Sequence, residues 1–81
     1  MSFPLFSRVA LSVDLPEFHL KAGDVATIVD LHETSHKTGY SLEVFNAKGD
    51  TMTVIVVEES QIQALREDEV LHVRHVDNLA A

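Results

Sequence analysis

The chain has no cysteine and no tryptophan, and its 81 residues include only three glycines and two prolines. Without cysteine, disulfide bonds and thiol catalysis are excluded, and a zinc site would depend on histidine and carboxylate ligands alone. The glycines are widely spaced, which excludes a glycine-rich phosphate-binding loop, and no serine lies in a Gly-x-Ser-x-Gly context. We therefore expect no enzymatic activity and no bound cofactor.

Basic residues are also scarce, with six lysines and arginines against thirteen acids and a formal net charge of −7. The six are scattered along the chain and form no basic stripe. Nucleic-acid binding depends on such residues to neutralise phosphates, so it is disfavoured. The negative charge favours a basic protein partner, and the alternative is that it serves solubility alone.

Long apolar runs are missing as well. The longest extends from Val54 to Val57, far too short to cross a bilayer. The first eight residues have neither the cationic start nor the long apolar core of a signal peptide. We predict a cytoplasmic protein that does not bind membranes.

What is present is alternation of apolar and polar side chains, in a chain that is 46% apolar and sized for one domain, residues 1–81. In the first run, for example, Val9, Leu11 and Val13 share one face of an extended segment. The alternation predicts five strands, at residues 8–14, 25–31, 39–45, 51–57 and 69–76.

Residues with special backbone or capping properties separate these runs. Pro16 is expected to end the first strand, and Gly49 to take the left-handed position of a hairpin loop. The carboxylates of Asp14 and Asp24 are each expected to accept a hydrogen bond from a nearby backbone amide. The predicted turn residues are Asp14, Pro16, Gly23, Asp24, Gly39 and Gly49.

Together these elements predict an all-β protein: a small, five-stranded, partly open SH3-like barrel with one short 3₁₀ turn before the last strand. An α+β fold is the alternative, if residues 60–69 form a full helix. The apolar lead at residues 1–7 is expected to cover one end of the core, and the tail at residues 77–81 to fray.

The strand at residues 51–57 carries apolar side chains on both faces, which indicates a central position or a second packing surface. We expect residues 1–7 or the helical turn to cover the face turned away from the barrel. If they do not, a homodimer would cover it.

The five histidines raise the possibility of a metal site. His32 and His36 could share a metal ion on a helix, but residues 32–38 are polar throughout and predict an exposed loop. His72 and His75 lie three apart in a predicted strand and point to opposite faces. We expect no metal, with His32 and His36 as the alternative.

The acids gather near the C-terminus. Adjacent carboxylates in exposed turns lack the burial or close pairing that catalysis requires, so a solvated acidic rim is the expected structure. Such a rim could meet a basic partner and raise its association rate. The partner-binding candidates are Glu58, Glu59, Glu67, Asp68 and Glu69.

Several segments resemble a known group, the small bacterial proteins of domain-of-unknown-function family 4926. The resemblance extends from about residue 9 to residue 74, with Ala26 where such proteins usually have a second glycine. It implies a compact β-rich domain and no particular activity. The segments that carry it are Asp14-Leu15-Pro16, Leu20-Lys21-Ala22-Gly23-Asp24-Val25, Thr27-Ile28-Val29, Gly39-Tyr40 and Glu43-Val44-Phe45.

The sequence therefore predicts a non-enzymatic, acidic protein-interaction module. One concrete version is an antitoxin-like or immunity-like protein that masks a basic toxin or nuclease. The alternative is a small-ligand or metal-binding accessory protein that uses the loop histidines.

Overall fold

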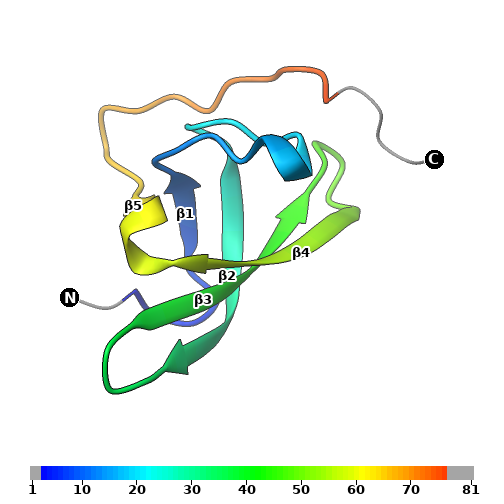
Figure 1. Cartoon of the computed structure of the whole chain (residues 1–81). Coiled ribbons are helices and arrows are strands. Elements are labelled where there is room, and N and C mark those ends of the chain that lie inside the picture. The colour runs from blue at the N-terminus through cyan, green and yellow to red at the C-terminus, as the bar shows by residue number, and fades with distance from the viewer. Residues whose placement is uncertain (1–2, 77–81) are drawn as a thin grey trace.

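Five antiparallel strands form one sheet in the order β4-β3-β2-β1-β5 in a computed structural model, which describes residues 3–76 (Figure 1). Two 3₁₀ turns, η1 and η2, are the helical elements of this part of the chain. The sheet is not closed, because β4 and β5 lie at its two edges. The predicted all-β, partly open architecture is confirmed. The elements are β1 (Arg8–Leu11), η1 (Pro16–Phe18), β2 (Val25–Glu33), β3 (Thr38–Phe45), β4 (Thr51–Glu58), η2 (Glu59–Gln61) and β5 (Ile62–Ala64).

The core lies on the concave face of the sheet and follows from period-two alternation. In β3, every second residue from Tyr40 to Val44 is buried, and Ile55 and Val57 of β4 lie opposite them. Neighbouring strands thus place their apolar side chains on the same face, where they pack together. The core residues are Val9, Leu11, Leu15, Leu20, Ala26, Ile28, Tyr40, Leu42, Val44, Ile55, Val57 and Ile62.

Tyr40 connects the N-terminal lead to the core. Its side chain is completely buried, and its hydroxyl accepts a hydrogen bond from the Phe3 amide (3.0 Å) and donates one to Glu59 Oε2 (3.1 Å). The two rings meet edge to face, with centroids 5.8 Å apart. Of the predicted apolar lead, Phe3 packs against the core, whereas Leu5 and Phe6 are exposed.

The last strand is not where the alternation placed it. β1 pairs with Ile62–Ala64, directly after η2, whereas residues 69–76 form no strand. Residues 62–64 follow η2 directly, so they reach β1 through a shorter loop than residues 69–76 would. Closing the shorter loop costs less chain entropy. Because η2 is a single 3₁₀ turn, the α+β alternative is wrong. The predicted fraying at residues 77–81 lies outside the described residues.

β4 is an edge strand, so the predicted central position is wrong. Its Ile55 and Val57 are buried, but Val54 and Val56 are 56% and 66% exposed. The expected cover from residues 1–7 or the helical turn is therefore also wrong, since both valines remain open to solvent. The contiguous apolar run reflects a strand with one buried and one exposed apolar face.

Four of the predicted turn residues act as expected. Gly23 and Gly49 have φ angles of +94° and +89°. Asp14 accepts a hydrogen bond from the Ala22 amide at 2.9 Å, and Asp24 accepts one from the Lys21 amide at 2.7 Å. These contacts fix the long connection between β1 and β2.

Two predicted turn residues have other roles. β1 ends at Leu11, before Pro16, and Pro16 instead begins η1, where its missing amide hydrogen costs nothing. Gly39 lies inside β3, paired with His32 and Glu58. A Cβ at Gly39 would lie 3.3 Å from a backbone oxygen of β4, so close approach of the strands, and not a turn, accounts for this glycine.

Replacing Gly49 with alanine is expected to lower the free energy of unfolding by about 1–2 kcal/mol, because an L-residue is strained at positive φ. Nothing lies within 4 Å of the added Cβ, so the loss would come from the backbone alone. Gly49→Asn should lose less, since asparagine tolerates the left-handed region. Urea unfolding measures both variants, and an equal loss would contradict this explanation.

Candidate functional site

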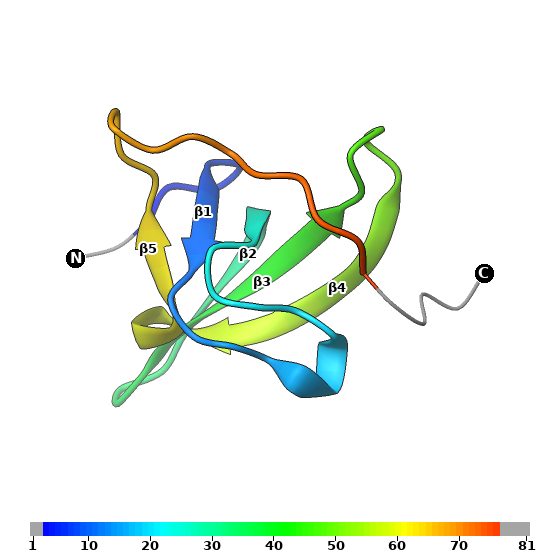
Figure 2. The same ribbon diagram turned by 90° about the horizontal axis from the view of Figure 1, so that it is seen from above.

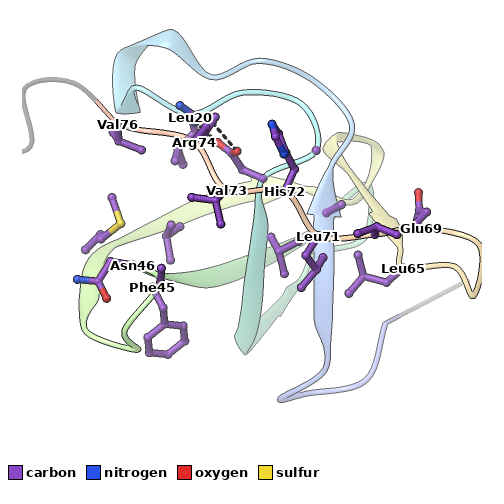
Figure 3. Close-up of a pocket in the computed structure, with 18 of the residues that line it drawn as sticks. Leu20, Phe45, Asn46, Leu65, Glu69, Leu71, His72, Val73, Arg74 and Val76 are labelled. Atoms are coloured by element: carbon purple, nitrogen blue, oxygen red, sulfur yellow. Dashed lines mark hydrogen bonds and ion pairs between the residues drawn. The ribbon is translucent and has the colours of Figure 1, made fainter.

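The C-terminal segment of the described chain crosses the open mouth of the sheet. We call residues 66–76 the strap; it leaves the β5 edge and runs over the molecule toward the β4 side (Figure 2). A groove of about 800 Å³ lies between the strap and the sheet (Figure 3). The side chains that the body of the protein contributes to it are mostly apolar and include Ala10, Leu20, Val25, Val44, Phe45 and Met52.

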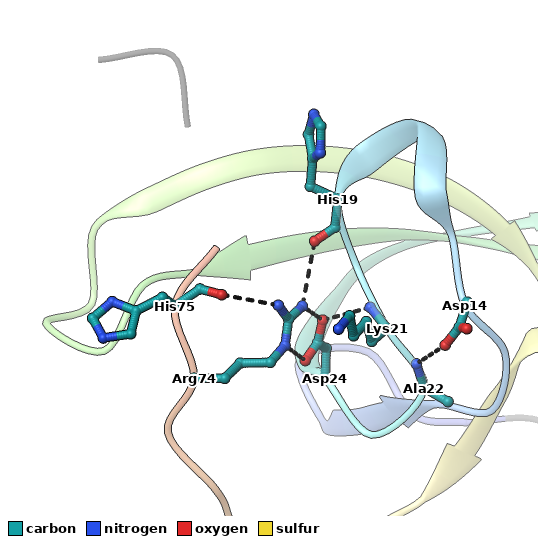
Figure 4. Close-up of polar contacts among 7 residues, drawn as sticks. All are labelled: Asp14, His19, Lys21, Ala22, Asp24, Arg74 and His75. Atoms are coloured by element: carbon teal, nitrogen blue, oxygen red, sulfur yellow. Dashed lines mark hydrogen bonds and ion pairs between the residues drawn. The ribbon is translucent and has the colours of Figure 1, made fainter. Parts of the chain in front are cut away.

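Arg74 of the strap contacts Asp24 at this groove (Figure 4). Arg74 Nε donates to Asp24 Oδ1 at 2.9 Å, and Nη2 donates to Oδ2. Nη2 also reaches the carbonyl oxygen of His19 at 3.3 Å. The Arg74 and Asp24 side chains are 27% and 21% exposed. The pair is therefore a partly buried, two-pronged ion pair, the geometry in which arginine binds carboxylates most specifically.

The local backbone fixes the position of Asp24. Its amide donates to the Lys21 carbonyl (3.0 Å), and its carboxylate accepts from the Lys21 amide (2.7 Å). The Leu11 amide donates to the Asp24 carbonyl, and the Gly23 amide donates to the Leu11 carbonyl, both at 2.8 Å. These bonds join the turn to β1, so the carboxylate is preorganised for a cation.

Two opposing effects act on the pKa of Asp24. Burial alone would raise the pKa, but the hydrogen bonds from Arg74 and the Lys21 amide, with the positive charge of Arg74, lower it. The net result is a pKa below the ordinary value for aspartate. Asp24 is thus a carboxylate suited to binding a guanidinium group.

The predicted acidic rim is divided between the two ends of β5. Glu58 and Glu59 precede the strand, and residues 67–69 follow it. Several of these acids have partners within the chain: Glu58 lies 3.9 Å from Lys37 Nζ, and Asp68 pairs with Arg66 at 3.3 Å. Glu58 is the last residue of β4, whereas residues 67–69 follow β5 at the other edge of the sheet, and intramolecular contacts offset part of the charge of these acids.

The two predicted loop histidines do not converge. His32 lies in β2, where its Nε2 is 2.7 Å from Ser41 Oγ and 4.0 Å from Asp30 Oδ2. His36 lies in the exposed loop between β2 and β3. Within residues 3–76, no group of three or more histidine or carboxylate side chains is arranged to hold a metal ion.

The residue that sequence reasoning missed is Arg74. The alternation predicts a strand at Arg74, and the sequence predicts only a turn role for Asp24. No local signal singles out Arg74, because residues 70–76 mix apolar residues with two histidines and this arginine.

The fold and the groove define a small, open, all-β domain. The chain belongs to the family described as "Domain of unknown function (DUF4926)", which matches residues 5–64, so the predicted resemblance is confirmed. The match ends before the strap, short of the predicted residue 74. No curated protein and no solved structure matches the chain, so the likeness to SH3-like barrels stays a prediction. Among the described residues, no helix has the length and apolar character to span a membrane.

Proposed function

We propose that this protein is a non-enzymatic interaction module that binds a basic protein partner, in the manner of an antitoxin or immunity protein. The observation that supports the proposal is that acids flank β5 in the chain, with Glu59 in η2 before it and residues 67–69 after it, and that β5 is an edge strand of the open sheet. An edge strand offers backbone groups for pairing, and the acids beside it would attract a cationic surface. With a net charge of −7, the protein as a whole favours the same kind of partner.

Two side chains have shifted pKa values, and contacts within the chain account for both. Asp24 has a lowered pKa and Tyr40 a raised one, and both shifts arise alongside contacts that hold segments of the chain together. Tyr40 joins the N-terminal lead to η2, and Asp24 joins the strap to the β1–β2 connection. Neither shift therefore calls for a catalytic explanation.

The proposal is tested by calorimetric titration of the protein with the basic products of its neighbouring genes. We expect one of them to bind, and its affinity to fall at least about tenfold between low and high salt. The double variant Glu67→Gln/Asp68→Asn should bind about tenfold more weakly, mainly through a slower association rate.

The matched control removes two exposed charges elsewhere, in Glu17→Gln/Asp50→Asn. The control should bind nearly as tightly as the wild type, because its charges lie away from β5. An equal loss in both double variants would show that net charge alone acts. Binding without salt dependence, or no binding by any of the basic gene products, would contradict the proposal.

A further inference from the structure

Among the described residues, the strap pairs with no strand, and its Arg74 makes an ion pair with the body of the protein. Its apolar residues Val70, Leu71 and Val73 are 92%, 55% and 79% exposed. By contrast, the Arg74 side chain is only 27% exposed, and it donates hydrogen bonds to Asp24 and to the His19 carbonyl. The guanidinium group of Arg74 is therefore the charged contact that holds the strap at the groove, and the partly buried Val76 accompanies it.

The domain wall of the groove and the strap belong to different parts of the chain. Asp24 and the apolar wall formed by Leu20, Val25, Val44 and Met52 lie within residues 5–64, the part that matches the family. The strap lies beyond that part. The domain thus supplies Asp24 and one wall of the groove, and residues 69–76 of the strap supply the facing wall.

We infer that the groove is a docking site for an extended segment of a basic partner protein, one that carries an arginine among aliphatic residues. The strap, with Arg74 between Val73 and His75, is the intramolecular stand-in for that segment. The inference rests on the proposed function for the basic character of the partner. It adds a second surface, on the concave side, and the chemistry that this surface recognises.

Charge complementarity selects this occupant. Asp24 presents two carboxylate oxygens to one planar group, a geometry that fits arginine better than lysine. The apolar walls of the groove suit aliphatic neighbours, and the acidic protein attracts cationic segments. A tethered strap competes at a high effective concentration, so the partner must displace it.

The test uses full-length protein and a fluorescently labelled peptide with the sequence of residues 69–76. Binding is followed by fluorescence anisotropy. In Arg74→Gln the strap loses its anchor, and we expect the peptide to bind at least about tenfold more tightly than to the wild type. The same peptide with glutamine in place of its arginine should bind Arg74→Gln at least about tenfold more weakly.

Adding Asp24→Asn to Arg74→Gln should reduce peptide binding by a similar factor, with circular dichroism checking that the variant folds. If the double variant does not fold, the two peptides still decide the question, because both are measured against the same protein, Arg74→Gln. Equal affinity of the two peptides for Arg74→Gln, or equal affinity of the arginine peptide for wild type and Arg74→Gln, would overturn the inference.

A second copy of the chain is the competing occupant. Sedimentation separates the possibilities, because a dimer formed through the exposed Val54 and Val56 of β4 should be unaffected by Arg74→Gln. A dimer that Arg74→Gln dissociates would overturn the assignment to a partner protein, because it would show that the strap of one copy binds in the groove of the other. The peptide result is also independent of the acids at β5: Glu67→Gln/Asp68→Asn leaves Asp24 intact, so failure of the salt-dependent binding and failure of the groove are distinguishable.

Discussion

Replacement of Tyr40 by alanine is expected to lower the free energy of unfolding by about 3–5 kcal/mol, the usual loss for a buried aromatic residue. Tyr40 is completely buried and is the largest such side chain among the described residues. A domain of 81 residues has a total stability of only about 4–12 kcal/mol. The variant should therefore lose a large part of its stability and unfold at a much lower urea concentration than the wild type, as urea titration followed by far-ultraviolet circular dichroism would show.

Two comparison variants accompany Tyr40→Ala: one removes only the hydroxyl group, and the other is a control on the exposed face of β4. Tyr40→Phe keeps the ring but leaves the Phe3 amide and the Glu59 carboxylate without this partner, at a cost of about 1–3 kcal/mol. Val56→Ala, on the exposed face of β4, should cost at most about 1 kcal/mol. Losses of the same size at Tyr40 and Val56 would contradict the placement of the core.

The hydroxyl also predicts a dependence on alkaline pH. Burial, followed by the hydrogen bond to Glu59 and the charge of that residue, raises the pKa of Tyr40 above its usual value, although the Phe3 amide opposes this. Above about pH 10, the unfolded chain releases the tyrosine proton while the folded protein still holds it, so stability falls as the pH rises. Tyr40→Phe should lack this part of the decline.

The strands whose alternation matches burial were the predictable part of the fold. In β3 the buried residues Tyr40, Leu42 and Val44 are those that share one face in the sequence. The left-handed glycines and the Asp14 and Asp24 caps were also predictable, because each depends on residues close in the chain. Local sequence carries such information directly.

Long-range competition was not predictable in the same way. Apolar and polar side chains alternate in residues 69–76 as they do in a strand, yet residues 62–64 pair with the edge of β1 instead. The exposed position of β4 likewise depends on the strand order and not on its own composition. The contact between Arg74 and Asp24 spans fifty residues, and no local pattern encodes it.

Release of the strap is the second large effect that we expect. Arg74→Ala should lower the backbone order parameters of residues 70–76 from near the rigid value of about 0.85 to below about 0.6, as measured by ¹⁵N relaxation. The other strap side chains should hold it only weakly, since Val70 and Val73 are mostly exposed, Val76 is only partly buried, and the segment pairs with no described strand. Arg66→Ala is the matched control, because Arg66 is 71% exposed and bonds within its own turn.

Acid should release the strap in the wild type, and the sign follows from the lowered pKa of Asp24. The ion pair contributes fully above about pH 4, the ordinary range of aspartate, and its contribution is lost as the pH falls through the lowered pKa. The order parameters of residues 70–76 should thus stay constant from pH 7 to 5 and fall only below about pH 4. Loss between pH 7 and 5 would indicate control by histidine instead, and Asp24→Asn should abolish the acid transition. A strap that stays ordered at low pH would show that the apolar contacts, and not the carboxylate, hold it.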